Sequence, residues 1–302
     1  MQIVTDGGID LPRETLEELN IHFVPLNIEL AGKSYKSGVD LTPPEFYRLL
    51  AETQEMPNTA TPSPGEFANL YRELAKDDPE ILSIHISSGL SGTFNVAQQA
   101  ADMVPEARIT FFDTKTLSAS QNWQVETAAK MIKLGVEFEK IMAWLKQIQQ
   151  KTQTFYTLPD LKYLIHGGRI SHIKGLLASA LKIAPLIEVS REDGKYYEIG
   201  KKMTFKKAVG EIVNKMGKVH PFGSSLRVQI AHAENPEGEE MLKALIDARY
   251  DCDWVPSGSI APALGAHTGP GLVGAAFTLL SDFPIFAQEI TMPFNHSAVQ
   301  VA

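Results

Sequence analysis

The chain has 302 residues, enough to bury a hydrophobic core in each of two domains. Hydrophobic residues make up 44% of the chain and charged residues 21%, a globular composition that excludes a disordered or fibrous protein. The formal net charge of -8 at pH 7 argues against nucleic acid as a partner, because a phosphate backbone is bound mainly through excess Lys and Arg.

Cysteine and histidine usage narrows the chemistry further. The single cysteine, Cys252, excludes an internal disulfide bond and a zinc site built from thiolates. The histidines and carboxylates lack ligand-like spacing, so no metal is expected. Residues 1–6 have the pattern of a β-strand and not of an export signal, and the apolar stretch 272–280 is far shorter than the roughly 20 residues of a membrane span. These features predict a soluble, cytoplasmic protein that at most touches a membrane surface transiently.

Short β-branched runs alternate with amphipathic patterns in the first half of the chain. This alternation predicts a mainly parallel sheet covered by helices. We expect the strands at Gln2–Thr5, Phe23–Glu29, Ile81–Ile86 and Ile109–Asp113. We expect the helices at Pro43–Glu52, Pro64–Lys76, Ser91–Met103, Trp123–Leu134 and Glu137–Gln150.

A second α/β unit follows. Beyond a strand at Thr152–Leu158, the glycine pair Gly167–Gly168 interrupts the pattern, and we place the domain boundary near it. The prediction is an N-terminal α/β domain over 1–160 and a smaller C-terminal α/β domain over 161–302. Its strands are expected at Pro185–Val189, Lys195–Ile199 and Arg227–His232. Its helices are expected at Lys174–Leu181, from Phe205, at Pro236–Arg249 and from Pro270, before an irregular or edge segment at the end.

Three segments place short polar residues and glycines where a strand gives way to a helix, the edge at which open α/β sheets bind ligands. In the first segment, residues 59–66, the sequence Ser-Pro-Gly-Glu starting at Ser63 is typical of a capping box with proline at the first helical position. Thr59 and Thr61 are not needed for that cap. Their hydroxyls are therefore free to donate to an anionic ligand.

The other two segments also favour an anion. In residues 86–93, Ser91 or a neighbour must cap the following helix, and the free N–H groups and dipole at that helix end attract a carboxylate or phosphate. In residues 265–271, His267 lies among glycines immediately before an expected helix, where it has little packing reason to be. An imidazole near a carboxylate can donate a hydrogen bond and gains proton affinity from the negative charge.

Several further stretches combine with these segments into a family pattern. They are Ile3-Val4-Thr5-Asp6, Asp10-Leu11-Pro12, Gly38-Val39-Asp40, Glu45-Phe46-Tyr47, Ile84-His85-Ile86-Ser87-Ser88, Gly167-Gly168-Arg169-Ile170 and His267-Thr268-Gly269-Pro270-Gly271. Their number and order make the chain resemble, over almost its whole length, the DegV family of bacterial fatty-acid-binding proteins.

The resemblance implies one long-chain (C14–C18) fatty acid held between two α/β domains by a carrier that is not itself an enzyme and uses no cofactor. In members that serve a fatty acid kinase, a separate kinase subunit phosphorylates the bound acid for phospholipid synthesis. Thr59 and Ser91 would hold the carboxylate, His267 would support it, and Arg169 would lie at the ligand opening or the partner surface. The residues implied around the carboxylate are Thr59, Thr61, Ser91, Gly92, Thr93, His267 and Thr268.

The chain departs from the family pattern at a few positions. Gly7 and Ala60 stand where the family usually has hydroxyl residues, so one donor is absent at Ala60, and Thr61 is expected to substitute for it. Residues Gly200–Met203 lack an arginine that many members carry. This second departure concerns coupling to a kinase and not fatty acid binding.

Two other classes of function compete with a carrier. A serine hydrolase or acyltransferase would use Ser91 as nucleophile and His267 as base. However, residues 89–93 place the second glycine one position early for the Gly-x-Ser-x-Gly elbow, and no acidic residue beside His267 stands out to orient it. A phosphate or nucleotide site ranks last, since no Gly-x-x-x-x-Gly-Lys-Ser/Thr or Gly-x-Gly-x-x-Gly pattern follows a strand.

Overall fold

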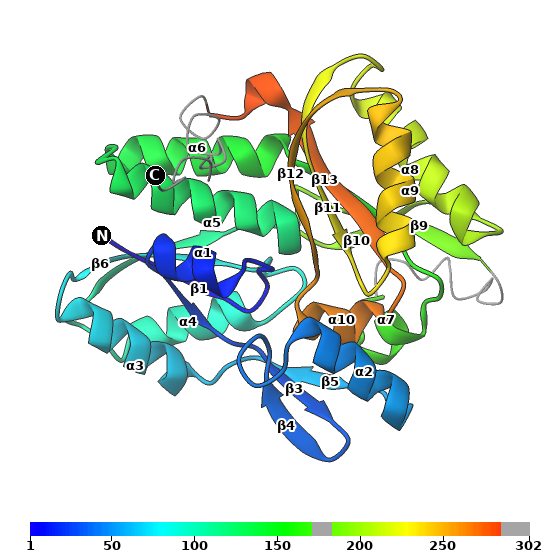
Figure 1. The fold of residues 1–302 in the computed structure, drawn as a ribbon. Helices are drawn as coiled ribbons and strands as arrows, with labels where there is room; N and C mark the ends of the chain where they lie inside the picture. The colour runs from blue at the N-terminus through cyan, green and yellow to red at the C-terminus, as the bar shows by residue number, and fades with distance from the viewer. Residues whose placement is uncertain (171–182, 285–302) are drawn as a thin grey trace, which may run out of the picture.

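The computed structural model describes residues 1–170 and 183–284. These residues form a mixed α/β fold with three sheets and flanking helices, which confirms the predicted fold class (Figure 1). The helix expected at Lys174–Leu181 and nearly all of the expected final segment lie outside the described residues. None of the helices in the described ranges has the length and apolar character needed to cross a bilayer.

The first sheet has four parallel strands in the order β2-β1-β6-β7. Its strands are β1 (Gln2–Asp6), β2 (Ile21–Val24), β6 (Glu80–His85) and β7 (Arg108–Asp113). Its helices are α1 (Arg13–Glu18), α3 (Pro64–Ala75), α4 (Thr93–Ala101), α5 (Ser118–Lys133) and α6 (Phe138–Lys151). Helices α1, α5 and α6 cover one face and α3 and α4 cover the other, each over its own buried apolar cluster. The predicted parallel sheet is confirmed.

The second sheet has six strands in the order β10-β9-β8-β13-β11-β12. Among its described strands, β11 and β12 pair in parallel and the other neighbours pair antiparallel. Its strands are β8 (Gln153–Thr157), β9 (Ala184–Val189), β10 (Tyr196–Lys202), β11 (Ser225–His232), β12 (Asp251–Ser259) and β13 (Val273–Leu279). Helices α8 (Phe205–Val219) and α9 (Pro236–Asp247) cover one face, and a 3-10 turn at Leu280–Asp282 follows the last strand.

The third sheet, which the sequence did not predict, has three short antiparallel strands in the order β4-β3-β5. They are β3 (Asn27–Leu30), β4 (Lys33–Lys36) and β5 (Asn58–Ala60). The single strand expected at Phe23–Glu29 is therefore wrong, because Pro25 has no N–H for the ladder and the chain changes sheets there. Helices α2 (Pro43–Thr53), α7 (Lys162–His166) and α10 (Pro262–Thr268) contribute to the core beside this sheet.

The helix expected from Pro270 is also wrong. The apolar run 273–279 is β13, which lies between β8 and β11 in the middle of the six-stranded sheet. Because a central strand is buried on both faces, its sequence does not alternate and resembles a buried helix. The neighbouring helix is α10, which ends at Thr268 before the glycines.

Strand β8 has a particular place relative to the predicted domains. It lies within residues 1–160 but pairs with β9 and β13 of the six-stranded sheet. Helix α5 packs between the two larger sheets, where Ala119 and Trp123 contact Ala276 and Phe283. The boundary after residue 160 stays a prediction.

Candidate ligand-binding site

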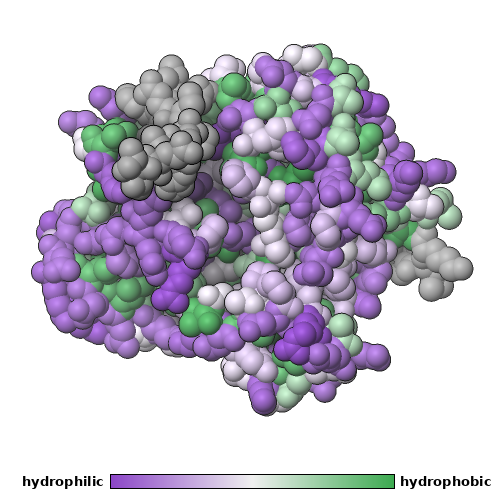
Figure 2. All heavy atoms as spheres, in the orientation of Figure 1, coloured by the Kyte–Doolittle hydropathy of each residue, from purple (hydrophilic) through white to green (hydrophobic). Residues whose placement is uncertain are grey.

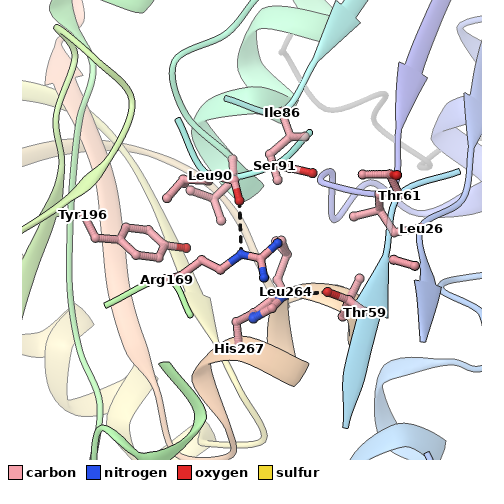
Figure 3. Close-up of a pocket in the computed structure, with 13 residues that line it drawn as sticks. Leu26, Thr59, Thr61, Ile86, Leu90, Ser91, Arg169, Tyr196, Leu264 and His267 are labelled. Atoms are coloured by element: carbon pink, nitrogen blue, oxygen red, sulfur yellow. Dashed lines mark hydrogen bonds between the residues drawn. The ribbon is translucent and has the colours of Figure 1, made fainter. Parts of the chain in front are cut away.

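A pocket lies where the three sheets approach one another (Figure 3). The cavity within it has a volume of about 40 Å³. Its lining residues are Leu26, Thr59, Ala60, Thr61, Ile86, Leu90, Ser91, Leu117, Arg169, Tyr196, Ala263, Leu264 and His267. Five of the residues that the sequence singled out, Thr59, Thr61, Ser91, Arg169 and His267, therefore meet in one place.

A side-chain hydrogen bond between two lining residues of this pocket joins β5 to α10. Thr59 Oγ1 lies 2.7 Å from His267 Nε2 (Figure 3). His267 lies in the last turn of α10, so the expectation that it immediately precedes a helix is wrong. In the tautomer protonated at Nε2, His267 donates to Thr59 Oγ1, and the Thr59 hydroxyl proton is left for an acceptor in the pocket.

The imidazole of His267 is held in an apolar, cationic surrounding. Its Nδ1 is buried without a hydrogen-bond partner in the described residues. Burial, together with the positive charge of Arg169 and the neighbouring His166, lowers the pKa of His267 to about 4. The ring is therefore neutral at pH 7 and does not supply positive charge in the ligand-free protein. A bound carboxylate would raise its proton affinity again.

Gly167 explains how the imidazole fits. A Cβ at this position would collide with His267 Nδ1 and also contact the Tyr163 carbonyl. Gly168 has φ +72°, in the left-handed region that favours glycine. The glycine pair thus serves close packing against the site and a turn, two roles that the sequence pattern alone did not separate.

The loop after β6 brings Ser91 to the pocket. Ser91 Oγ accepts the Thr93 N–H at 3.3 Å and lies 2.8 Å from Thr93 Oγ1. The N-cap of α4 is Gly92 and not Ser91, whose hydroxyl instead accepts the N–H of the first helical residue. The position of Ser91 in the pocket leaves it able to contact a ligand as well. Gly92 lines a separate open pocket on the outer side, and Thr93 is fully buried.

A buried polar chain fixes the start of this loop. Asp6 Oδ2 accepts the Ile86 N–H and faces His85 Nδ1, both at 2.9 Å. His85 Nε2 lies 2.7 Å from Ser83 Oγ, which contacts the Tyr71 hydroxyl at 2.8 Å. Because these side chains are completely buried, we assign the chain to holding the strand end and not to chemistry.

Arg169 stands between the interior and the outside. Its Nε–H donates to the Leu90 carbonyl at 3.2 Å (Figure 3). One terminal nitrogen donates to the Gly167 carbonyl at 2.5 Å. It lines both the inner pocket and the open outer pocket that includes Gly92 and Lys195. Arg169 is therefore positioned to attract an anion from outside toward the hydroxyl groups within.

An apolar pocket, whose cavity also has a volume of about 40 Å³, adjoins the first one. Both pockets are lined by Leu117, Tyr196 and Leu264. Its other lining residues are Ser118, Ala119, Thr154, Tyr156, Ala231, Ile260, Thr268, Leu272, Gly274, Ala275 and Ala276. Thr268 thus lies in the apolar pocket, and its hydroxyl donates back to the Leu264 carbonyl at 3.3 Å.

Sequence reasoning did not predict the apolar lining residues or Tyr196. Tyr196 begins β10 and is 4% exposed, with its hydroxyl directed toward Arg169 (Figure 3). The β13 residues that line the apolar pocket are small (Gly274, Ala275 and Ala276), and a Cβ at Gly274 would collide with Tyr156. No local pattern marks these residues, because strands from distant parts of the chain bring them together.

The arrangement does not favour nucleophilic catalysis. Ser91 Oγ is bonded to Thr93, while His267 is bonded to Thr59, so the two candidates do not form a nucleophile and base pair here. Among the described residues, no carboxylate is hydrogen-bonded to His267, and no group of three or more acidic, His or Cys side chains could hold a metal ion. What the site offers is a set of hydrogen-bond donors beside an apolar space.

Fold and pocket together define a class: an α/β protein with an interior ligand site formed between its sheets. A family model described as "Uncharacterised protein, DegV family" matches residues 1–279. The chain belongs to the DegV family, as the sequence motifs indicated. A DegV domain-containing protein of Staphylococcus aureus strain MRSA252 is 36% identical over 90% of this chain and 96% of its own length.

Solved structures with the same fold are described by their ligands. A DegV family protein from Thermus thermophilus, described by its fatty acid binding, has a TM-score of 0.85 at 27% identity, covering 92% of this chain and 99% of that one. DegV from Bacillus subtilis, described as a fatty acid binding protein, has a TM-score of 0.82 at 28% identity, with 92% and 98% covered. A stearic acid-binding protein from Eubacterium ventriosum has a TM-score of 0.79 at 25% identity, with the same coverage.

Proposed function

We propose that this protein binds one long-chain fatty acid, with the carboxylate among Thr59, Thr61, Ser91 and His267 and the acyl chain in the adjoining apolar pocket. The observation that supports this most is that the two pockets share Leu117, Tyr196 and Leu264 in their linings, while hydroxyl, imidazole and guanidinium groups line the first and mainly apolar residues line the second. An amphipathic ligand with one anionic end matches that change. The fatty acids bound by relatives of the same fold support the same conclusion.

The polar end accounts for recognition of the head group. An ionised carboxylate without partners in a protein interior costs several kcal/mol, so donors must replace its water. The Thr59, Thr61 and Ser91 hydroxyls can donate, and Arg169 supplies a positive charge at the opening. These groups would fix the orientation of the ligand and reject a plain alkane.

The apolar end accounts for affinity. Each methylene removed from water contributes about 0.8 kcal/mol, so a chain of about fifteen methylenes supplies roughly 12 kcal/mol before ordering costs. The resemblance to the family and the stearic acid-binding relative favour a C14 to C18 acid as the ligand. Side-chain rearrangement around the small residues of β13 would set how much of the chain enters.

A carrier role follows from a site that binds without a catalytic pair. We propose that the protein carries its fatty acid in the cytoplasm, touches a membrane surface only transiently, and presents the carboxylate to a separate fatty acid kinase subunit. The opening beside Arg169 and Lys195 is the place where a partner could reach the carboxylate. The chemistry would then belong to the partner.

Native mass spectrometry of the purified protein, with extraction of the bound lipid, tests the proposal. We expect one C14 to C18 acid per chain, and replacing Ala276 by Phe in the apolar pocket should reduce its occupancy. Replacing the exposed Ala248 by Phe serves as the control. A lipid-free protein that ignores added oleate and palmitate would contradict the proposal. Covalent labelling of Ser91 by a fluorophosphonate would favour the hydrolase instead.

A further inference from the structure

Helix α10, which carries His267, is tied to the N-terminal half of the chain at its start as well as at its end. The Ala261 N–H, just before the helix, donates to Asp10 Oδ1 at 2.6 Å. The Ala263 N–H donates to Ser37 Oγ at 3.1 Å. Because the helix has only seven residues and is about 10 Å long, a shift at its start also displaces His267.

Asp10 forms hydrogen bonds with more than one segment of the chain. Its Oδ2 accepts a hydrogen bond from the Ser118 hydroxyl, and its N–H donates to Asn122 Oδ1 at 3.0 Å. Ser118 has φ +56°, a strained conformation for a residue other than glycine, and its N–H is held by the Gly8 carbonyl at 2.8 Å. One carboxylate therefore joins the loop after β1 to the starts of α5 and α10.

The groups joined by Asp10 enclose the ligand site, although Asp10 lines neither of its two pockets. Ser118 and its neighbour Leu117 line the apolar pocket from α5. Leu264 of α10 lines both pockets. The carboxylate is thus placed to set the separation of α5 and α10 across the site.

We propose that Asp10 is a positioning residue: its carboxylate holds the start of α10 so that His267 stays at hydrogen-bonding distance from Thr59 and the fatty acid is retained. This inference rests on the proposed function. During binding, the ligand carboxylate competes for the Thr59 and His267 end of the helix. The hydrogen bonds at the start of the helix, to Asp10 and to Ser37, then remain.

The electrostatics of Asp10 separate this role from a purely structural one. Burial raises the pKa of the Asp10 carboxyl to about 6, against the opposing effect of the hydrogen bonds from Ser118 and Ala261. Protonated Asp10 thus contributes stability at low pH that is lost as the pH rises through about 6. At pH 7.5 the buried Asp10 carboxyl is ionised, which costs free energy. The neutral amide of Asp10→Asn removes that cost, so the substitution should not lower the melting temperature.

Other groups around Asp10 titrate elsewhere. On α5 its neighbours are the hydroxyl of Ser118 and the amide of Asn122, and at α10 it meets a backbone N–H. On α2, Tyr47 senses the charge of Asp10, and burial first and then Asp10 and Glu234 raise the Tyr47 pKa far above neutrality. A step in ligand release between pH 7.5 and 5.5 that disappears in Asp10→Asn therefore reports Asp10.

The test compares oleate release from the full-length wild type, Asp10→Asn and a control, Asp251→Asn, with a fluorescent polyene fatty acid as the displacing probe. Asp251 is exposed, and it accepts a hydrogen bond from the Ser225 hydroxyl at 2.9 Å. This Asp–Ser pair matches the chemistry of Asp10 and Ser118 but lies away from the ligand site. At pH 7.5 we expect about tenfold faster release from Asp10→Asn, with an unchanged or higher melting temperature, and no change in the control. The ratio of the two rates should approach one at pH 5.5.

Each other outcome counts against the inference. Equal release rates for wild type and Asp10→Asn at pH 7.5 would overturn it while leaving fatty acid binding intact. Faster release with a matching loss of melting temperature, or failure of Asp10→Asn to fold, would show a structural role only. A wild type that does not bind oleate would overturn the proposed function as well.

Discussion

His267 Nε2 and Thr59 Oγ1 lie 2.7 Å apart although 208 residues separate them in the chain. The contact joins a helix at the end of the six-stranded sheet to the edge of the small three-stranded sheet. It places one donor pair at the polar end of the interior space. The predicted head-group site depends on this contact more than on any other.

Removing the Thr59 hydroxyl should weaken fatty acid binding. Thr59→Val keeps the shape of the side chain, whereas Thr59→Ser keeps the hydroxyl and serves as the control. We expect about tenfold or greater loss of oleate affinity in the valine variant, because a buried partner loses its hydrogen bond, and little change in the serine variant. Isothermal titration measures both. Equal affinities for the two variants would show that Thr59 does not contact the head group.

Ser91→Ala should weaken binding and slightly destabilise helix α4. Its hydroxyl accepts the Thr93 N–H, so we expect a stability loss of about 1 kcal/mol and about tenfold weaker binding. Urea denaturation and oleate titration give the two numbers. If the variant bound oleate like the wild type, the Ser91 hydroxyl would serve only the start of α4.

The free energy of unfolding should depend on pH in the way expected for a protein with a buried neutral imidazole. The pKa of His267 is about 4 in the folded protein, against 6.5 for an ordinary histidine, so its contribution is present above pH 6.5 and is lost as the pH falls through about 4. His267→Asn should therefore lose less stability than the wild type between pH 7 and pH 5, by on the order of 1 kcal/mol. Urea denaturation at both pH values tests this. If the wild type and His267→Asn lost equal stability between pH 7 and pH 5, the imidazole would lie in a more solvated site.

Gly167→Ala should displace His267. The added methyl group would collide with His267 Nδ1, so we expect oleate affinity to fall together with the contact to Thr59. Gly168→Ala is the control, since its Cβ meets no atom within 4 Å and adds only the strain of φ +72°. A crystal structure of Gly167→Ala with the imidazole in place, or normal binding by that variant, would refute the packing argument.

The tail pocket should select ligands by length. Ala276→Phe fills space beside Trp123 and Phe283, so long acids should lose more affinity than short ones. Each methylene that no longer fits removes about 0.8 kcal/mol, so the preference for palmitate over laurate should shrink by tenfold or more. Competition binding with both acids measures the ratio. An unchanged ratio would place the acyl chain elsewhere.

Sequence reasoning worked best where a local pattern has one physical solution. Ser63, Pro64 and Glu66 form the predicted capping box at the start of α3. It failed at Pro25, where one apparent strand splits between two sheets, and at 273–279, where a strand buried on both faces lacks a period. In both cases the tertiary surroundings decided the secondary structure, and those surroundings cannot be deduced from a single sequence.

The sequence by itself determined the fold class, the family and the segments that carry hydroxyl, imidazole and guanidinium groups. Those properties follow from local patterns and motif order, which do not need three-dimensional contacts. Only the tertiary structure decided that Thr268 faces the apolar pocket while Thr59 meets His267, that Tyr196 stands beside Arg169, and that Asp10 reaches Ala261. Such contacts join residues that are far apart in the chain, and their geometry arises only when the sheets and helices pack.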